Sequence, residues 1–180
     1  MHLPHTEGTV LPEWIDANGH MNLAYYVVLF DRATAAIYHA LGIGDAYRTA
    51  SGRSPFAVEM HTLYEREMRA GERVRISSRL LGADSKRLHY FHQMFHAEQG
   101  HRVAAQELMA LHIDLKVRKA TPFAPDILER LQNAVNATAG EPLPLGIGRR
   151  ITSLDGHRTP ARDQPQGAHA NADRLKAGLS

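Results

Sequence analysis

Five residues whose types could support catalysis crowd into one short stretch near the N-terminus: Asp16, Asn18, Gly19, His20 and Asn22. The carboxylate of Asp16 is ionised at neutral pH, so it can act as a nucleophile or as a general base. Asn22 suits the N-cap of the helix predicted after it, whose first turn, around Leu23, offers unpaired backbone N–H groups. A carboxylate, an imidazole and free N–H groups in one turn make a candidate catalytic site.

Structural roles would also explain the same residues. Asp is common in turns, Asn is a common helix cap, and Gly19 permits a positive φ whatever the function. His20 could orient Asp16, contact a substrate or only complete a hydrogen bond. The residues alone therefore leave the catalytic and the structural interpretation of this turn both open.

The element that must position the turn is the segment from residue 23 to 41, which is apolar on nearly every side. Its pattern is broken mainly by Asp31, Arg32 and His39, and a helix that is apolar all round is typical of a buried position. Gly42 follows, where a left-handed residue often ends a helix. We therefore predict a buried helix that the rest of the chain surrounds.

Alternation of apolar and polar residues dominates most of the remaining sequence, as expected of strands. The predicted strands cover residues 7–15, 56–68, 73–82, 86–98 and 102–117. Tight turns join the last four into an antiparallel meander. Residues 42–53 are expected to form a loop, and residues 125–135 a short amphipathic helix.

One buried helix and one long antiparallel sheet predict an α+β domain in which the sheet curls around the helix. The opposite face of the sheet, or an edge, would leave Phe91 and Phe95 uncovered. We therefore expect a second copy to cover them, in a homodimer or a dimer of dimers.

Residues 139–180 differ in composition from the rest, since they hold 6 of the 14 Gly and 4 of the 9 Pro. They predict a disordered C-terminal tail behind a domain of residues 1–138. Residues 1–139 carry equal numbers of basic and acidic side chains, so the formal charge of +2 lies in the remainder. A neutral domain argues against a nucleic-acid groove across it.

The chain has no cysteine, which excludes a disulfide and a zinc site made of thiolates. No run is long enough to cross a membrane, and the first residues lack the pattern of a signal segment. We therefore expect a cytoplasmic protein with neither a membrane nor a nucleic acid as its partner.

The order of strand, Asp-Ala-Asn-Gly-His-Met-Asn turn, long apolar helix and four-stranded meander resembles the hotdog-fold acyl-CoA thioesterases of the 4-hydroxybenzoyl-CoA thioesterase type. The resemblance covers about residues 7–135. The signature of that family, an Asp three residues before a Gly and then His-x-Asn, falls on Asp16, Gly19, His20 and Asn22. The resemblance implies that Asp16 is the catalytic carboxylate, with His20 and Asn22 beside it and the oxyanion donor at Leu23.

Two further stretches, residues 58–71 and 80–89, resemble the betainyl-CoA thioesterases of carnitine breakdown. Some members of that group are fused behind a carnitine dehydrogenase domain, which this chain lacks. The resemblance implies hydrolysis of betainyl-CoA to betaine and CoA. Hydrolysis of a medium-chain or aromatic acyl-CoA, or binding of acyl-CoA without catalysis, remain the alternatives.

A trimethylammonium group has no N–H to donate, so aromatic faces are suited to hold it. The rings expected near the turn are Trp14, Tyr25, Tyr26 and Tyr64. Trp14 shares strand parity with the carboxylate of the turn, if the extended path continues. The same rings would also suit a plain apolar core or a neutral acyl group.

Basic side chains could hold the phosphates of CoA, and no other cofactor is expected. Lys86 and Arg87 are the candidates, together with the row formed by Arg73, Arg75 and Arg79. A solvated sheet face would explain these side chains equally well.

Other titratable side chains have simpler interpretations. Asp31, the acid of the predicted helix, is the rival to Asp16, although a buried salt bridge to a neighbouring Arg is its expected role. Glu59 and Glu67 are expected to be solvated on the polar face of their strand. His92 and His96 share a strand face but lie roughly 13 Å apart, too far for one metal ion, so no metal site is expected.

Overall fold

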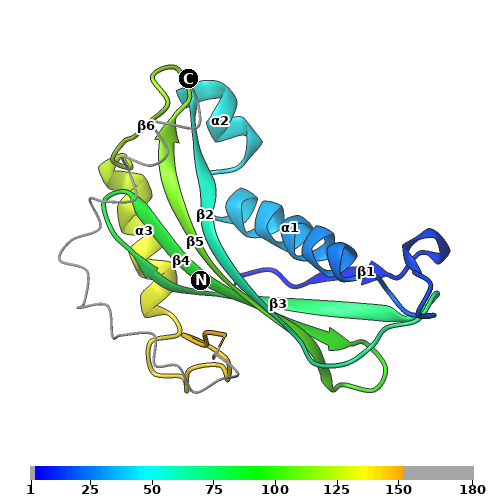
Figure 1. Cartoon of the computed structure of the whole chain (residues 1–180). Coiled ribbons are helices and arrows are strands. Elements are labelled where there is room, and N and C mark those ends of the chain that lie inside the picture. The colour runs from blue at the N-terminus through cyan, green and yellow to red at the C-terminus, as the bar shows by residue number, and fades with distance from the viewer. Residues whose placement is uncertain (1–2, 152–180) are drawn as a thin grey trace, which may run out of the picture. The chain divides into compact units, whose positions relative to one another are not determined.

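The structure, a computed structural model, describes residues 3–151 of the 180-residue chain. The predicted hotdog arrangement is confirmed: a curved antiparallel sheet packs against one long helix, α1 (Figure 1). The strands are β1 (Thr6–Thr9), β2 (Arg53–Tyr64), β3 (Arg73–Ala83), β4 (Arg87–His96), β5 (Arg102–Asp114) and β6 (Lys119–Ala120). The helices are α1 (Leu23–Ala40), α2 (Asp45–Ser51) and α3 (Pro125–Asn136), with a 3-10 turn at Pro12–Trp14.

The strands lie in the order β1-β3-β4-β5-β2, and β6 pairs with β5. Strands β3, β4 and β5 form three of the four strands of the predicted meander. The predicted pairing of strand 56–68 with strand 73–82 is wrong, because β2 lies at the far side of the sheet and pairs with β5. Strand β2 therefore forms one edge of the sheet. In the part of the chain that the structure describes, no helix is long and apolar enough to span a bilayer.

Helix α1 begins and ends where the sequence predicts. The side chain of Asn22 accepts a hydrogen bond from the Ala24 N–H, and Gly42 has a φ of 73° beyond the helix end. One side of α1 is buried, with Phe30 and Ile37 fully enclosed. The prediction of a helix enclosed on all sides is wrong for this chain by itself, because residues such as Val28 and Asp31 are exposed on the opposite side.

The predicted strand over 7–15 is interrupted. Strand β1 ends at Thr9, and Pro12 opens a 3-10 turn that ends at Trp14. Pro at the start of a helical turn is favourable because its fixed φ suits the turn and its missing N–H is not needed there. The strand parity expected between Trp14 and Asp16 is therefore broken. The loop expected over 42–53 instead contains α2, which is capped at its C-terminus by Gly52 with a φ of 64°.

In β2 the alternation of apolar and polar residues predicts the burial of side chains poorly. Its apolar residues Val58, Met60 and Tyr64 are 39%, 52% and 47% exposed. The register shifts between Ala57 and Glu59, and the strand ends at Tyr64, four residues before the predicted end. An edge strand has a neighbour on one side only, so the apolar side chains of β2 are less covered than those of β3 or β4.

The core has two parts along α1. Around the N-terminal half of α1 lie Val10, Met21, Met68, Met94 and Val103. Around its C-terminal half, helix α3 packs with residues including Ile127 and Leu131, next to Leu80 and Leu88 of the sheet. The candidate catalytic turn therefore lies at one end of the sheet, and the β3–β4 turn with α3 lies at the other.

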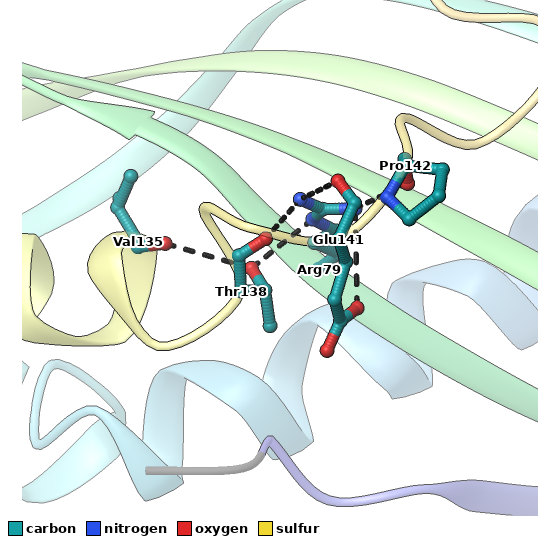
Figure 2. Close-up of polar contacts among 5 residues, drawn as sticks. All are labelled: Arg79, Val135, Thr138, Glu141 and Pro142. Atoms are coloured by element: carbon teal, nitrogen blue, oxygen red, sulfur yellow. Dashed lines mark hydrogen bonds and ion pairs between the residues drawn. The ribbon is translucent and has the colours of Figure 1, made fainter.

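The segment 138–148, which follows α3, is held against the sheet. Arg79 of β3 donates hydrogen bonds to Thr138 Oγ1 (3.0 Å), to the Glu141 carbonyl (3.2 Å) and to the Pro142 carbonyl (2.8 Å), and also contacts the Thr138 carbonyl (Figure 2). Arg102 donates to the Leu145 carbonyl at 2.8 Å. Five backbone or hydroxyl acceptors of one segment are therefore satisfied by two sheet arginines.

This segment covers the face of the sheet turned away from α1. His92 contacts Thr34 of α1, so its neighbour Phe91 faces the other way. Phe91 is nevertheless only 1% exposed, and Gly146 lies against it and against Leu63. The expectation that a second copy must cover Phe91 is therefore wrong, because the chain covers this ring itself.

The boundary expected between a domain of residues 1–138 and a tail from Ala139 also differs from the structure. Residues up to Gly148 belong to the same compact unit as the sheet. The Gly148 N–H donates to the Glu107 carboxylate at 2.6 Å, which fixes the end of that unit. The remainder of the predicted tail, residues 152–180, lies outside the described residues.

Candidate active site

A closed backbone turn presents the predicted catalytic residues. The Asp16 N–H donates to the His20 carbonyl (3.1 Å), and the Gly19 N–H donates to the Asp16 carbonyl (3.0 Å). Gly19 has a φ of 80°, a conformation that glycine adopts at little cost. The Asn22 N–H donates to the Trp14 carbonyl at 2.9 Å, so the chain leaves the turn beside the point where it entered.

Both oxygens of the Asp16 carboxylate have a donor within the turn. The Asn18 N–H donates to Oδ1 at 2.8 Å, and the Asn22 side-chain amide donates to Oδ2 at 3.3 Å. The oxygen of the same Asn22 amide accepts the Ala24 N–H at 3.0 Å. Asn22 thus joins the carboxylate to the start of α1, and the half-buried Asp16 is held in one orientation.

The start of α1 leaves one donor available. Asn22 accepts both the Ala24 N–H, through its side chain, and the Tyr25 N–H, through its carbonyl. Within residues 3–151, no acceptor contacts the Leu23 N–H. This N–H lies at the positive end of the helix dipole, where a developing negative charge is stabilised.

The polar contacts of His20 are with residues other than Asp16. Its Nε2 lies 3.7 Å from the carboxylate of Glu67, and its Nδ1 lies 3.5 Å from the Met21 carbonyl. Glu67 is solvated as predicted, but its placement on the strand is wrong, because β2 ends before it and the following loop returns to the turn. The Met21 N–H donates to the Met68 carbonyl at 2.7 Å, which fastens that loop to the turn.

A cleft of about 330 Å³ opens between the turn and this loop. Three of the predicted catalytic residues, Asp16, His20 and Leu23, line it. Two of the four predicted rings, Tyr26 and Tyr64, also line it. The loop that follows β2 contributes residues 65–67, which sequence reasoning did not include because the strand was predicted to continue through them.

The two tyrosines of the cleft form an edge-to-face pair, with ring centroids 5.3 Å apart and an angle of 84°. Tyr26 donates its hydroxyl to the Arg66 carbonyl (3.0 Å), and Tyr64 donates to the Leu23 carbonyl (3.4 Å). Burial, together with the charge of nearby Glu67, raises the pKa of Tyr26 to about 12, so its phenol stays protonated.

The other two predicted rings form a separate pair. Trp14 and Tyr25 stack at 5.0 Å with nearly parallel planes, and the guanidinium of Arg32 lies 5.6 Å from the Trp14 ring. Trp14 is 6% exposed, and neither ring lines the cleft. The structure therefore separates the four rings into a packed pair and a cleft pair.

The candidates for CoA phosphates are not gathered at the cleft. Lys86 and Arg87 lie in the β3–β4 turn at the other end of the sheet, where Asp84 accepts hydrogen bonds from both backbone N–H groups and from the Arg87 side chain. Arg73 pairs with Glu7, and Arg79 holds the 138–148 segment.

The remaining candidates lie apart from the cleft. Asp31 is exposed on α1, so the buried salt bridge expected for it is wrong. His92 is buried, with its two ring nitrogens contacting the hydroxyls of Ser78 (2.7 Å) and Thr34 (3.0 Å). Among residues 3–151, no three His, Asp or Glu side chains are grouped as a metal site would require.

Known proteins resemble this chain in sequence and in fold. Residues 10–131 match the family model of the Thioesterase-like superfamily. The chain is 39% identical over 145 residues to a betainyl-CoA thioesterase of Pseudomonas aeruginosa, an alignment that covers 81% of this chain and 91% of that protein.

Two other relatives extend the comparison. The chain is 35% identical to an L-carnitine dehydrogenase/betainyl-CoA thioesterase of Agrobacterium fabrum, over 86% of this chain but only 30% of that longer protein. The structure of a Staphylococcus aureus protein in complex with CoA superposes with a TM-score of 0.78 at 23% identity, covering 85% of this chain and 96% of that one. This chain belongs to the Thioesterase-like superfamily.

Proposed function

We propose that this protein is an acyl-CoA thioesterase that hydrolyses betainyl-CoA to betaine and CoA. The observation that carries the proposal is the 39% identity to a betainyl-CoA thioesterase across 91% of that protein. The turn that holds Asp16 lies within the matched region, beside a cleft of a size suited to a short acyl group. The CoA-bound Staphylococcus aureus structure, which shares the fold, supports CoA as the carrier.

In the proposed reaction Asp16 acts either as the nucleophile or as the base that activates water. As a nucleophile, its carboxylate attacks the thioester carbonyl carbon, the C–S bond breaks, and water then hydrolyses the mixed anhydride. As a general base, Asp16 instead takes a proton from water, and the resulting hydroxide attacks the same carbon. In both routes the sulfur leaves as CoA thiolate and is then protonated.

The start of α1 would stabilise the tetrahedral intermediate. Both routes place a negative charge on the former carbonyl oxygen, and the Leu23 N–H is a donor without another acceptor in the described part of the chain. Preorganised backbone donors of this kind account for a large share of catalysis in acyl transfer. Asn22 contributes by holding Asp16 in a fixed position relative to that donor.

The test compares Asp16→Asn with Asp31→Asn. Asp31 is the acid of α1 and the rival candidate, but it is exposed and outside the cleft, so it controls for the change of charge. We expect Asp16→Asn to lower the kcat for betainyl-CoA by about a hundredfold or more, because the nucleophile or base is lost. Thiol release would measure turnover, and circular dichroism would check folding. Near-normal turnover in folded Asp16→Asn would overturn the assignment of Asp16.

The substrate is tested separately with a panel of acyl-CoAs. The panel includes betainyl-CoA and its neutral isostere 3,3-dimethylbutyryl-CoA, which has carbon in place of the quaternary nitrogen. The proposal predicts a higher kcat/KM for betainyl-CoA. A preference for the neutral isostere, or for medium-chain or aromatic esters, would overturn the betaine assignment while leaving the thioesterase activity in place.

A further inference from the structure

The loop that follows β2 places Glu67 in the cleft beside the catalytic turn. Its carboxylate lies 3.7 Å from His20, and the side chain of Glu67 is 67% exposed. Two contacts fix this loop: Tyr26 donates to the Arg66 carbonyl, and Met21 donates to the Met68 carbonyl. Glu67 is therefore held between two backbone anchors while its charged end remains accessible to a ligand.

The carboxylates that line the cleft differ in how their charge is used. Glu65 pairs with the Arg102 guanidinium at 2.9 Å, which neutralises it. Asp16 accepts hydrogen bonds from Asn18 and Asn22 and is the proposed reactive group. Among the described residues, the ion-pair partner of Glu67 is the His20 imidazole. Glu67 is thus the lining carboxylate whose negative charge is available to a ligand.

The chemistry of a quaternary ammonium requires such a charge. The group cannot donate a hydrogen bond, so a protein recognises it through aromatic rings and through anions in van der Waals contact. In betainyl-CoA a single methylene separates the nitrogen from the reacting carbonyl carbon, so the recognition groups must lie in the cleft that contains Asp16. The Tyr26 and Tyr64 rings and the Glu67 carboxylate meet this condition.

We propose that Glu67 is a specificity-determining residue, whose carboxylate lies against the trimethylammonium group of the acyl chain while the cleft tyrosines supply the aromatic contact. This inference rests on the proposed function, since it assigns the recognition of that substrate to a residue. It differs from a second role suggested by the geometry, in which Glu67 serves only to position His20. Loss of a positioning role would lower activity on every acyl-CoA equally, whereas loss of charge recognition would lower activity only on the cationic ester.

The experiment measures kcat/KM for betainyl-CoA and for 3,3-dimethylbutyryl-CoA in the wild type, Glu67→Gln and Glu67→Asp. Glu67→Gln keeps the shape and removes the charge. We expect a roughly five- to tenfold loss on betainyl-CoA and little change on the isostere, a modest size because solvent screens an exposed carboxylate. Glu67→Asp keeps the charge and should retain most of the preference. The matched control, Glu129→Gln, removes an exposed carboxylate of α3 outside the cleft and should change neither value.

The outcomes separate the two proposals. An equal loss on both esters would overturn charge recognition and assign Glu67 to the support of His20. No loss on either ester would also overturn it. A wild type that does not prefer betainyl-CoA would overturn the substrate assignment itself, a result read from the wild type alone. High ionic strength should weaken the preference of the wild type for betainyl-CoA over the isostere but should not change the preference of Glu67→Gln. This result would support the proposal further.

Discussion

The side chain of Asn22 makes two contacts, one typical of a helix cap and one with the proposed catalytic carboxylate. Its amide oxygen accepts the Ala24 N–H, as any N-cap would, but its amide nitrogen donates to Asp16. The first contact fixes which end of the amide faces the helix, so the second follows from it. A cap that could only accept hydrogen bonds would therefore stabilise the helix without supporting the carboxylate.

The variant Asn22→Asp tests this distinction. Asp caps helices about as well as Asn, so the change in the free energy of unfolding should stay within about 1 kcal/mol. The new carboxylate, however, would lie beside Asp16, and two like charges at this separation disfavour each other. We expect kcat/KM to fall by roughly tenfold or more, measured by thiol release beside a thermal melt. Wild-type activity in a stable variant would reduce Asn22 to a cap.

Sequence reasoning at this scale succeeds where the chemistry is local. Asp16, Asn22 and Leu23 lie within one turn, so their proximity could be predicted from their spacing alone. Glu67 could not, because its position depends on where β2 ends, and the alternation of apolar residues continues past that end. The prediction that Trp14 lies with the cleft rings assumes an extended chain, which the 3-10 turn interrupts.

At the scale of elements, His92 joins α1 to the sheet. It is fully buried between the Thr34 hydroxyl of α1 and the Ser78 hydroxyl of β3, and it stacks on Phe30 at 5.8 Å. Burial lowers the pKa of His92 to about 3, because the charged ring would lose its hydration. The helix that presents the catalytic turn is therefore fastened to the sheet by a neutral imidazole.

This histidine predicts an acid-sensitive stability. An unfolded histidine takes up its proton near pH 6.5, whereas folded His92 stays neutral down to about pH 3. Between these values the unfolded state binds more protons, so the contribution of His92 to stability is present above about pH 6.5 and is lost as the pH falls.

The loss should amount to roughly 1 kcal/mol per pH unit. Urea unfolding between pH 4 and 7 would measure it. In the variant His92→Gln, which cannot titrate, the slope of the unfolding free energy against pH should be smaller by about one proton. The control His39→Gln, on the exposed side of α1, should keep the wild-type slope. An unchanged slope in His92→Gln would contradict the assignment.

The 138–148 segment is the element that composition described least well. Its proline and glycine content predicts disorder, but Gly146 has a φ of 105°, which favours glycine, and a Cβ at this position would also lie 2.7 Å from the Leu63 side chain. Pro142 supplies a carbonyl that Arg79 binds, and as a proline it has no N–H that would need an acceptor. Composition indicates only that such a segment will not form a helix or a strand, and it carries no information on what the segment covers.

Truncation at two positions tests the role of this segment. A chain that ends at Gly148 keeps every contact described for the segment, so its stability should match that of the full chain. A chain that ends at residue 138 exposes the Phe91 ring and removes the Glu141 and Pro142 carbonyls that the half-buried Arg79 binds. We expect a loss of about 2–4 kcal/mol in the free energy of unfolding, measured by urea titration. Equal stability of the two truncated chains would show that the segment contributes nothing.

At the scale of the whole molecule, the edge of the sheet at β2 remains to be explained. Within the described residues, β2 pairs with β5 on one side only, and one of its exposed apolar residues, Tyr64, lines the cleft. Leu23 and Val28 of α1 are also 62% and 39% exposed. A monomer that left this edge in water would expose a template for pairing and an apolar surface together. We therefore propose a homodimer that forms through β2, in place of the sheet-face contact expected from Phe91.

The variant Met60→Lys tests the dimer. Met60 is 52% exposed on β2, so a lysine there can remain solvated in the monomer but would place a charge in the proposed interface. Val117→Lys is the matched control, because Val117 is 58% exposed in the turn between β5 and β6 and lies outside β2. Light scattering at micromolar concentration should give twice the chain mass of 20.0 kDa for the wild type and for Val117→Lys, and a value near one chain mass for Met60→Lys. Because the cleft adjoins this edge, the monomeric variant should also lose thioesterase activity while keeping its circular dichroism spectrum. A monomeric wild type, or a Met60→Lys protein that remains dimeric and active, would contradict the β2 interface.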